Sequence, residues 1–254
     1  MQLLPIPALR DNYIWLLYDS NHHAVVIDPG ECEPVLHVAR RLKLQVSHIL
    51  LTHHHADHVG GSAELARHFQ ARIVAPDDTR IDPADHRVGD GDVLTLGQPR
   101  TRFHVLAVPG HTRSHVAYFG AGFLFCGDTL FSLGCGRLFE GTPAQMLASL
   151  DRLSVLPART RVCCGHEYTL DNARFARTIE PDNQSLLRRE RQVRRLRASG
   201  RPSLPVALAR ERDCNPFLRV DREGVKAWGA RRGVAGDRVS LFAALREAKD
   251  DFAT

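Results

Sequence analysis

The chain is organised around the stretch Thr52-His53-His54-His55-Ala56-Asp57-His58, which continues into Val59-Gly60-Gly61. Five potential metal ligands occupy six consecutive positions, in a chain that has 14 His among 254 residues. Chance placement of His does not produce such a concentration. Imidazole and carboxylate groups are ligands of borderline first-row metals, and their crowding here indicates more than one ion. The sequence is therefore interpreted first as that of a metalloprotein.

The local pattern predicts how this cluster is presented. A short apolar strand over residues 47–52 leads into it. In an extended segment His53 and His55 project to the same side, so both can reach one ion. Asp57 and His58 follow where the chain turns towards a helix, and their side chains can reach a second ion.

Three further candidate ligands share one position in the pattern, because each comes just past a predicted strand and beside a Gly. They are His111 after strand 103–108, Asp128 after strand 123–126 and His166 after strand 161–164. Loops that leave one edge of a sheet converge on a common site, so we expect these residues to join the cluster. The remaining histidines are assigned to the core or the surface, including His54, which an extended backbone points away from its neighbours.

Strand patterns gathered in runs, with helices between some of them, predict two sheets packed face to face with helices outside. The predicted strands cover 13–18, 24–28, 47–52, 72–75, 92–96, 103–108, 115–119, 123–126 and 161–164, and the predicted helices 34–41, 62–70 and 142–153. After His166 the composition changes to an Arg-rich helix over 175–198 and a closing helix over 241–252. A boundary between about 165 and 175 is expected, followed by a mostly helical second domain.

Composition excludes several classes of protein. The chain is 43% hydrophobic, which is typical of a globular rather than a disordered protein. No apolar run is long enough to span a bilayer, and the N-terminal residues do not resemble a signal peptide. The six Cys residues lack a CxxC spacing, and free thiols in a reducing cytosol are the expected state. We therefore expect a cytoplasmic monomer without a membrane partner.

The positive charge is concentrated in the last third of the chain. From Glu167 onward there are 19 Lys and Arg against 13 Asp and Glu, while the whole chain has a net charge of +5. Two interpretations remain open at this point: an anion-binding face near the active site, or the solvated surface of a helix.

The His cluster, together with His111, Asp128 and His166, resembles the metallo-β-lactamase superfamily over about the first 170 residues. More narrowly, the whole chain resembles the glyoxalase II family of hydroxyacylglutathione hydrolases. The stretches that carry this second resemblance are Gly134-Cys135-Gly136-Arg137, Phe139-Glu140-Gly141-Thr142, Gly165-His166-Glu167-Tyr168-Thr169, Glu180-Pro181-Asp182-Asn183, Asn215-Pro216-Phe217-Leu218-Arg219 and Leu245-Arg246-Glu247-Ala248-Lys249-Asp250.

The resemblance implies an αββα metallo-β-lactamase-like sandwich over residues 1–168 and a helical substrate-binding domain over 169–254. It also implies two divalent ions per chain, with one ion held by His53, His55 and His111, the other by Asp57, His58 and His166, and Asp128 bridging both. Seven protein ligands are too many for one tetrahedral site but suit two ions that share a carboxylate and a solvent molecule. Ligation by nitrogen and oxygen without thiolate is expected to hold Zn, with Fe and Mn as alternatives.

The reaction implied by the resemblance is hydrolysis of a glutathione thioester, S-lactoylglutathione in the first place, by a metal-bridging hydroxide that Asp57 helps to orient. The thiolate leaving group has a conjugate acid of pKa about 8.5 and needs little help from a general acid. The family pattern places substrate contacts at Arg137, Phe139, His166, Tyr168, Arg246 and Lys249. Phe139 stands where the family often has an aromatic hydroxyl, and Arg137 where it often has Lys, so the glycine-carboxylate contact is expected to differ.

Three alternatives accompany this interpretation. One is another enzyme on the same scaffold, such as a mononuclear iron persulfide dioxygenase, a lactonase or a β-lactamase. A metal content near two ions per chain would favour the hydrolase, and a content near one iron would favour the dioxygenase. A second is a nucleic-acid processing hydrolase, suggested by the basic stretch 188–197, although few aromatic residues interrupt that stretch and we expect no nucleic-acid partner. The third is a non-catalytic binding module, for which all seven ligand types would have no use.

Overall fold

The computed structural model describes residues 1–234 and 236–252, and its contacts divide the chain into two units. Unit 1 contains residues 1–107, 114–127 and 163–166. Unit 2 contains residues 108–113, 128–162 and the chain from 167 onward. Each unit is described by itself.

Unit 1 contains two β-sheets. The first has the strand order β1-β2-β3-β4-β5-β6, with its first three strands antiparallel and the rest parallel: β1 (Gln2–Ala8), β2 (Asn12–Tyr18), β3 (His23–Ile27), β4 (Gln45–Leu50), β5 (Arg72–Pro76) and β6 (His86–Val88). The second is antiparallel in the order β10-β9-β8-β7: β7 (Val93–Leu96), β8 (Thr101–Ala107), β9 (Val116–Gly120) and β10 (Phe123–Gly127). The end of β13 (Arg161–Cys164) lies beside β10.

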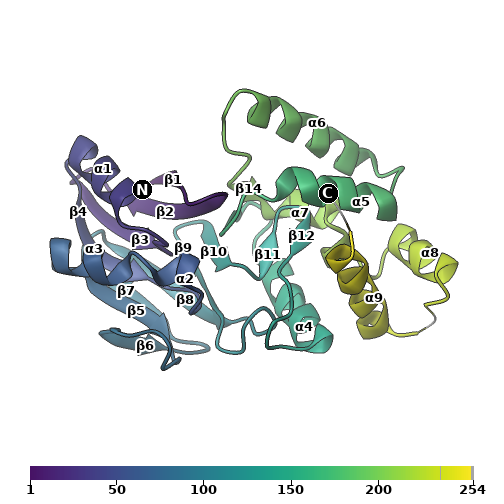
Figure 1. Ribbon diagram of the computed structural model, residues 1–254, viewed down its shortest axis with the longest axis horizontal. Coiled ribbons are helices and arrows are strands. Elements are labelled where there is room, and N and C mark those ends of the chain that lie inside the picture. Colours follow the sequence, from purple (N-terminus) through teal and green to yellow (C-terminus); the bar gives the residue numbers. More distant parts are fainter. Residues whose placement is uncertain (235, 253–254) are drawn as a thin grey trace. The chain divides into compact units, whose positions relative to one another are not determined.

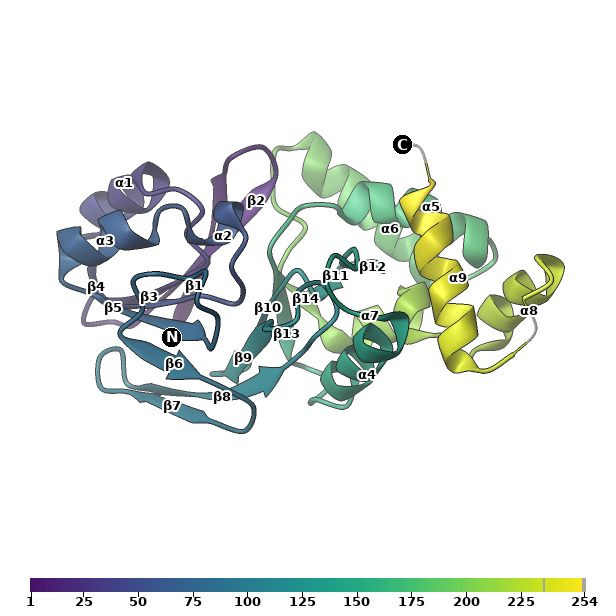
Figure 2. The same ribbon diagram turned by 60° about the horizontal axis from the view of Figure 1, so that its bottom comes forward.

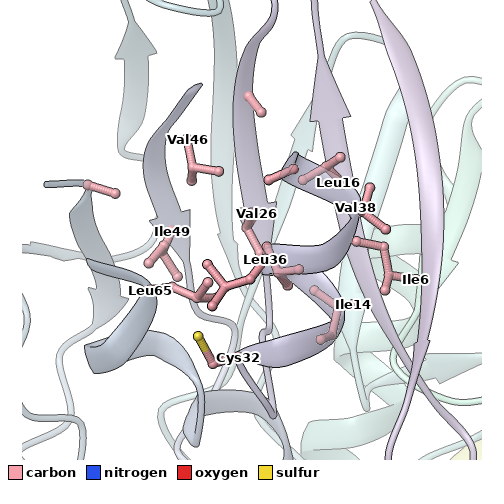
Figure 3. Close-up of a cluster of buried hydrophobic side chains, with 14 of the residues drawn as sticks. Ile6, Ile14, Leu16, Val26, Cys32, Leu36, Val38, Val46, Ile49 and Leu65 are labelled. Carbon is pink, nitrogen blue, oxygen red and sulfur yellow. The ribbon is translucent and has the colours of Figure 1, made fainter. Parts of the chain in front are cut away.

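Helices cover one face of the first sheet, as Figure 1 shows for α1 (Glu33–Leu42) and α3 (Ser62–Phe69). Pro34 lies in the first turn of α1, where its missing N–H costs nothing, and Lys43 ends the helix in a left-handed conformation. The apolar side of α1 includes Leu36, which packs with Leu65 of α3 into the core drawn in Figure 3. This burial, rather than intrinsic propensity, stabilises short helices of this kind.

The opposite face of the first sheet packs on the second sheet. Side chains alternate across a strand, so Trp15 points away from the helix side that Ile14 and Leu16 occupy. The Trp15 indole is buried and donates a hydrogen bond to the Cys164 carbonyl. Helix, sheet and sheet therefore form successive layers, and the predicted pair of facing sheets with helices outside is confirmed.

Unit 2 is mostly helical. Its helices are α4 (Pro143–Ser154), α5 (Thr169–Ile179), α6 (Gln184–Ala198), α7 (Leu208–Cys214), the 3₁₀ turn η1 (Pro216–Leu218), α8 (Glu223–Arg231) and α9 (Arg238–Asp250). In Figures 1 and 2, α5 and α6 lie side by side. A small hairpin of β11 (Leu130–Phe131) and β12 (Gly134–Cys135) precedes α4, and β14 (Val206–Ala207) pairs with the start of β13. The expected helical region towards the C-terminus is thus confirmed.

The prediction of one helix over 175–198 is wrong. The structure has α5 and α6 instead, separated at residues 180–183. Pro181 supplies no backbone N–H to continue α5. The side chain of Asn183 accepts hydrogen bonds from the Ser185 and Leu186 amides and so starts α6. Among the helices of residues 1–234 and 236–252, none is both long and apolar enough to cross a bilayer.

Candidate metal centre

The His cluster follows directly from β4, and a buried carboxylate holds the chain where it leaves the sheet. Asp28 comes just after β3 and accepts two hydrogen bonds from Thr52, one from the backbone amide at 2.8 Å and one from the hydroxyl at 2.7 Å. The Thr52 hydroxyl oxygen also lies 3.0 Å from Nδ1 of His53. This chain of contacts fixes the ring of His53 from its rear, so that its Nε2 is available to the site.

Unit 1 brings five of the predicted ligands into two groups. Nε2 of His53 and Nδ1 of His55 lie 3.2 Å apart. Oδ2 of Asp57 lies 3.7 Å from Nε2 of His58 and 3.4 Å from Nε2 of His166. One ligand atom from each of these last three residues falls within 4.8 Å of the others. Such convergence of nitrogen and carboxylate oxygen atoms is the donor set of a divalent metal ion.

Two acidic side chains orient the imidazoles of this second group. Nδ1 of His58 lies 3.1 Å from the Asp28 carboxylate, and Nδ1 of His166 lies 2.7 Å from the Asp11 carboxylate. A carboxylate on Nδ1 keeps the proton on that nitrogen and leaves Nε2 as a ligand. The residues therefore fit a bound cation, and the contacts of Asp28 and Asp11 to these rings are not among the sequence predictions.

Two more residues of unit 1 support the ligands. His115 is fully buried, and its ring stacks on that of His53 with centroids 4.5 Å apart and planes at 15°. The amide of Asn12 donates a hydrogen bond of 3.0 Å to Oδ2 of Asp57. The sequence pattern predicts His115 only as the first residue of the strand 115–119 and carries no signal that relates it to the ligands.

Unit 2 pairs the two remaining predicted ligands. Nε2 of His111 lies 3.6 Å from Oδ2 of Asp128, and both residues are buried. Nδ1 of His111 lies 2.9 Å from the Arg137 carbonyl oxygen, which again leaves Nε2 as the ligand atom. Gly136 packs so closely on this pair that a Cβ there would lie 1.9 Å from the Asp128 carbonyl oxygen. Only glycine allows that approach of the two backbones.

Three of the predicted substrate residues are accessible in unit 2. The side chain of Arg137 is 63% exposed, and its Nε lies 3.3 Å from the Asp250 carboxylate. Phe139 is an exposed aromatic ring. Tyr168 is half-buried and packs edge-on against Phe131 with centroids 5.1 Å apart.

Arg246 and Lys249 differ from each other in setting. Arg246 is buried, and its guanidinium donates to the Cys135 carbonyl at 2.7 Å and to Asp250 at 2.9 Å. Lys249 is half-buried with its ammonium over the rings of Phe175 and Phe252. Burial, and then the cations of Arg246 and Arg137, lower the pKa of Lys249. Three cations thus lie near two carboxylates, those of Asp171 and Asp250, and such an excess of positive charge can receive an anionic ligand.

The fold and these ligand groups define a class of protein, the metallo-β-lactamase superfamily, whose family model matches residues 9–166. A second model, described as the hydroxyacylglutathione hydrolase C-terminus, matches residues 167–252. A hydroxyacylglutathione hydrolase of Xanthomonas campestris pv. campestris (strain B100) is 51% identical over 99% of this chain and 99% of its own length. One from Xylella fastidiosa (strain M23) is 49% identical over 99% and 98%. The chain belongs to the hydroxyacylglutathione hydrolase family.

Solved structures are similar at lower sequence identity. ETHE1 from Myxococcus xanthus has a TM-score of 0.67 at 28% identity and covers 98% of this chain and 97% of its own. TTHA1623 in a di-iron-bound form has a TM-score of 0.56 at 30% identity, over 64% of this chain and 91% of that one.

Proposed function

We propose that this chain hydrolyses a glutathione thioester, with S-lactoylglutathione as the substrate and lactate and glutathione as the products. The observation that carries the proposal is the group formed by Asp57, His58 and His166, in which each imidazole is oriented from behind by a carboxylate. Relatives about half identical over the full chain are named hydroxyacylglutathione hydrolases, which supports the same substrate class.

Two divalent ions per chain form part of the proposal, with Zn first and Fe or Mn as alternatives. One ion would be held by His53, His55 and His111, the other by Asp57, His58 and His166, and Asp128 would serve both. When bound, such ions lower the pKa of coordinated water and stabilise the oxyanion that develops on the substrate carbonyl. The absence of thiolate among these side chains supports a hard or borderline cation.

The chain's own groups complete the chemistry. Among the Asp57, His58 and His166 side chains, that of Asp57 is the most exposed, at 39%, and Asn12 already donates to its Oδ2. We assign Asp57 the orientation of the attacking solvent molecule, which its carboxylate would hold as a hydrogen-bond acceptor. The leaving thiolate is a weak base, because its conjugate acid has a pKa of about 8.5, so its departure requires no further general acid.

Substrate recognition is assigned to the helical domain, for which we propose the range 169–254, and to four residues that precede it in the chain, Arg137, Phe139, His166 and Tyr168. Arg137, Tyr168 and Lys249 are the accessible polar groups of the set, and His166 would meet the acyl part. Arg246 would act beside Lys249 and Phe139 would line the glutathione glycine end. A guanidinium suits bidentate recognition of a carboxylate, and an ammonium acts as a point charge.

The basic helix α6 is proposed to be a solvated surface and not a nucleic-acid site. Glu190 pairs with Arg177 at 3.1 Å and with Arg194 at 2.6 Å. Arg189 is buried, and Glu211 is one of the charges that act on it. Part of the positive charge is therefore compensated inside the unit. We therefore propose that nucleic acid is not a partner of this chain. We also propose that the chain is a cytoplasmic monomer and that its partner is the glutathione thioester substrate.

The test is hydrolysis of S-lactoylglutathione by purified protein, followed at the thioester absorbance, with elemental analysis of the same sample. We expect turnover and close to two metal ions per chain. One iron per chain with no thioester turnover would instead favour the persulfide dioxygenase alternative. Salt-dependent binding of RNA or DNA would revive the nucleic-acid alternative.

A further inference from the structure

The β11–β12 hairpin lies between two pieces of the proposed site. Asp128 lies two positions before it, and Arg137, whose carbonyl meets the His111 ring, lies two positions after it. The hairpin has only two residue pairs, Leu130 with Cys135 and Phe131 with Gly134. Two paired positions are too few for a hairpin to hold its own shape in water.

Three buried side chains hold the hairpin, and we call them the hairpin clamp: Asn172 of α5, Glu211 of α7 and Asn215 between α7 and η1. Glu211 of α7 accepts from the Ser132 hydroxyl at 2.7 Å and from the Leu133 amide at 2.7 Å. Burial raises the pKa of this fully enclosed carboxyl, and these hydrogen bonds oppose that rise. Moving the Glu211 carboxyl away from the turn would leave it buried without these partners, which is unfavourable.

The two amides of the clamp satisfy the backbone carbonyls of the same turn. Nδ2 of Asn215 donates to the Phe131 carbonyl at 3.1 Å and to the Gly134 carbonyl at 3.0 Å. Nδ2 of Asn172 donates to the Ser132 carbonyl at 3.0 Å. Buried backbone groups must find partners, and here the two Asn side chains provide them in place of water or a longer ladder of strand hydrogen bonds.

The turn also contains a strained residue. Leu133 has φ of 62°, a left-handed backbone conformation that side chains with a Cβ rarely adopt. Such strain persists only where the surroundings over-determine it. The Leu133 amide is the group that Glu211 accepts from, so the clamp acts on the residue that most needs support.

The base of the hairpin contacts the two proposed ligands His111 and Asp128. The Gly136 amide donates to the Thr129 carbonyl at 3.2 Å, which closes the two ends of the hairpin on each other. Gly136 in turn packs on the Asp128 backbone, and the next carbonyl, that of Arg137, meets Nδ1 of His111. A displacement of the hairpin would therefore move both His111 and Asp128.

We propose that Asn172, Glu211 and Asn215 are positioning residues, which hold the hairpin so that His111 and Asp128 are set at ligand geometry before any metal binds and Arg137 is presented to the substrate. This inference deepens the proposed function and rests on it for the roles of His111, Asp128 and Arg137. It also gives a role to Asn215 in the stretch Asn215-Pro216-Phe217-Leu218-Arg219, which contains none of the proposed substrate contacts.

The first experiment needs neither metal nor substrate. Hydrogen exchange of the Leu133 and Gly136 amides is measured in the full-length, metal-free protein and in the single variants Ser132→Ala, Asn172→Ala and Glu211→Ala. We expect protection of both amides in the natural protein and its loss in the variants, with Glu211→Gln retaining most of it because an amide oxygen can still accept from Leu133. Fast exchange of these amides in the natural protein would overturn the clamp, whatever the enzyme does.

The second experiment asks whether the clamp serves the site. Release of bound metal to a chelator and the separate values of kcat and KM are measured for the same variants. We expect metal release about tenfold faster, as for other residues that orient ligands, and a raised KM at saturating metal because Arg137 is displaced.

A matched control distinguishes positioning from general stability. Glu180 and Arg219 form a two-pronged ion pair in the same unit, at 2.7 and 2.9 Å, without contact to the hairpin turn. Glu180→Gln should lower the melting temperature and leave metal release and KM unchanged. Equal metal release and KM in Ser132→Ala, Asn172→Ala and Glu180→Gln would reduce the clamp to ordinary core packing and refute the inference. A natural protein that binds no metal would instead count against the proposed function, and the exchange result would still decide the clamp.

Discussion

Replacement of Asp28 by Asn would change the ligand nitrogen that His58 offers. The Thr52 backbone amide can only donate, and it lies 2.8 Å from Oδ1 of Asp28. An asparagine must therefore turn its oxygen to Thr52 and its NH₂ group to the place of Oδ2. That place is 3.1 Å from Nδ1 of His58. The NH₂ group donates, so Nδ1 becomes the acceptor and the imidazole proton moves to Nε2, the nitrogen nearest Asp57.

The magnitude follows from the loss of this orientation. Changes to groups that orient a metal-binding histidine cost about 10- to 100-fold in metal affinity, or about 1.4–2.7 kcal/mol. The folded metal-free protein should lose less, about 1 kcal/mol, because the Thr52 amide contact survives and the hydrogen bonds to the carboxylate are replaced by neutral ones rather than left unmade. We therefore expect Asp28→Asn to weaken metal binding by more than it lowers the free energy of unfolding.

The assay is a competition titration of metal between protein and a chromophoric chelator, with thermal unfolding of the metal-free protein measured beside it. Asp19→Asn is the control, because Asp19 also lies against a histidine ring, His23, at 3.3 Å in the same unit but outside the ligand set. Metal affinity should be unchanged in that control. An Asp28→Asn protein that binds both ions as tightly as the natural one would refute the reasoning about the tautomer of His58.

The other predictions concern Asp128, the cationic cluster and the thiols. Asp128→Asn should lower metal content and activity together, by elemental analysis and thioester assay, and full activity would remove Asp128 from the site. Lys249→Ala should raise KM about tenfold, as for loss of one charge-assisted contact of about 1.4 kcal/mol, and a pure turnover defect would argue against a binding role. Because burial lowers the pKa of Lys249, its charge is lost as the pH rises through that lowered value, so KM should climb in the alkaline range and Lys249→Ala should abolish that climb. Arg246→Ala should raise KM too, but it should also lower the free energy of unfolding by about 2–4 kcal/mol in a denaturant titration, since two buried or half-buried hydrogen bonds of a charged group are lost. Mild alkylation should leave activity intact, because the six Cys are buried and burial raises the pKa of Cys135 to about 11, and inactivation that tracks one modified thiol would reveal a missed nucleophile.

Local patterns were enough to predict most of the elements that present the ligands. The strand before His53 and the strands before His111 and His166 depend on alternating or continuous apolar residues, which signal burial without knowledge of the rest of the chain. The helix over 142–153 was predicted from Thr142 and Pro143, and the structure has the corresponding capping box. Where one local signal was overlooked, as at Pro181 and Asn183, the helix prediction failed.

The apolar periodicity of the sequence did not predict the shortest elements. The β11–β12 hairpin has two residue pairs and a left-handed Leu133, and its partners Glu211 and Asn215 lie some 80 residues further along the chain. The hairpin is stabilised by those distant side chains and not by its own propensity, so no window of sequence around it could reveal it.

The sequence by itself indicated which side chains could bind metal, because ligand chemistry belongs to residue types and the His53–His58 run places several of them at neighbouring positions. It also determined the layered architecture, through the period of its apolar residues. Only the tertiary structure decided which groups stand behind the ligands: Asp28 behind His58, Asp11 behind His166 and the Arg137 carbonyl behind His111. Those contacts join positions up to 155 residues apart, and hydrogen bonds of this kind depend on distances of a few tenths of an ångström that exist only once the sheets and helices have packed.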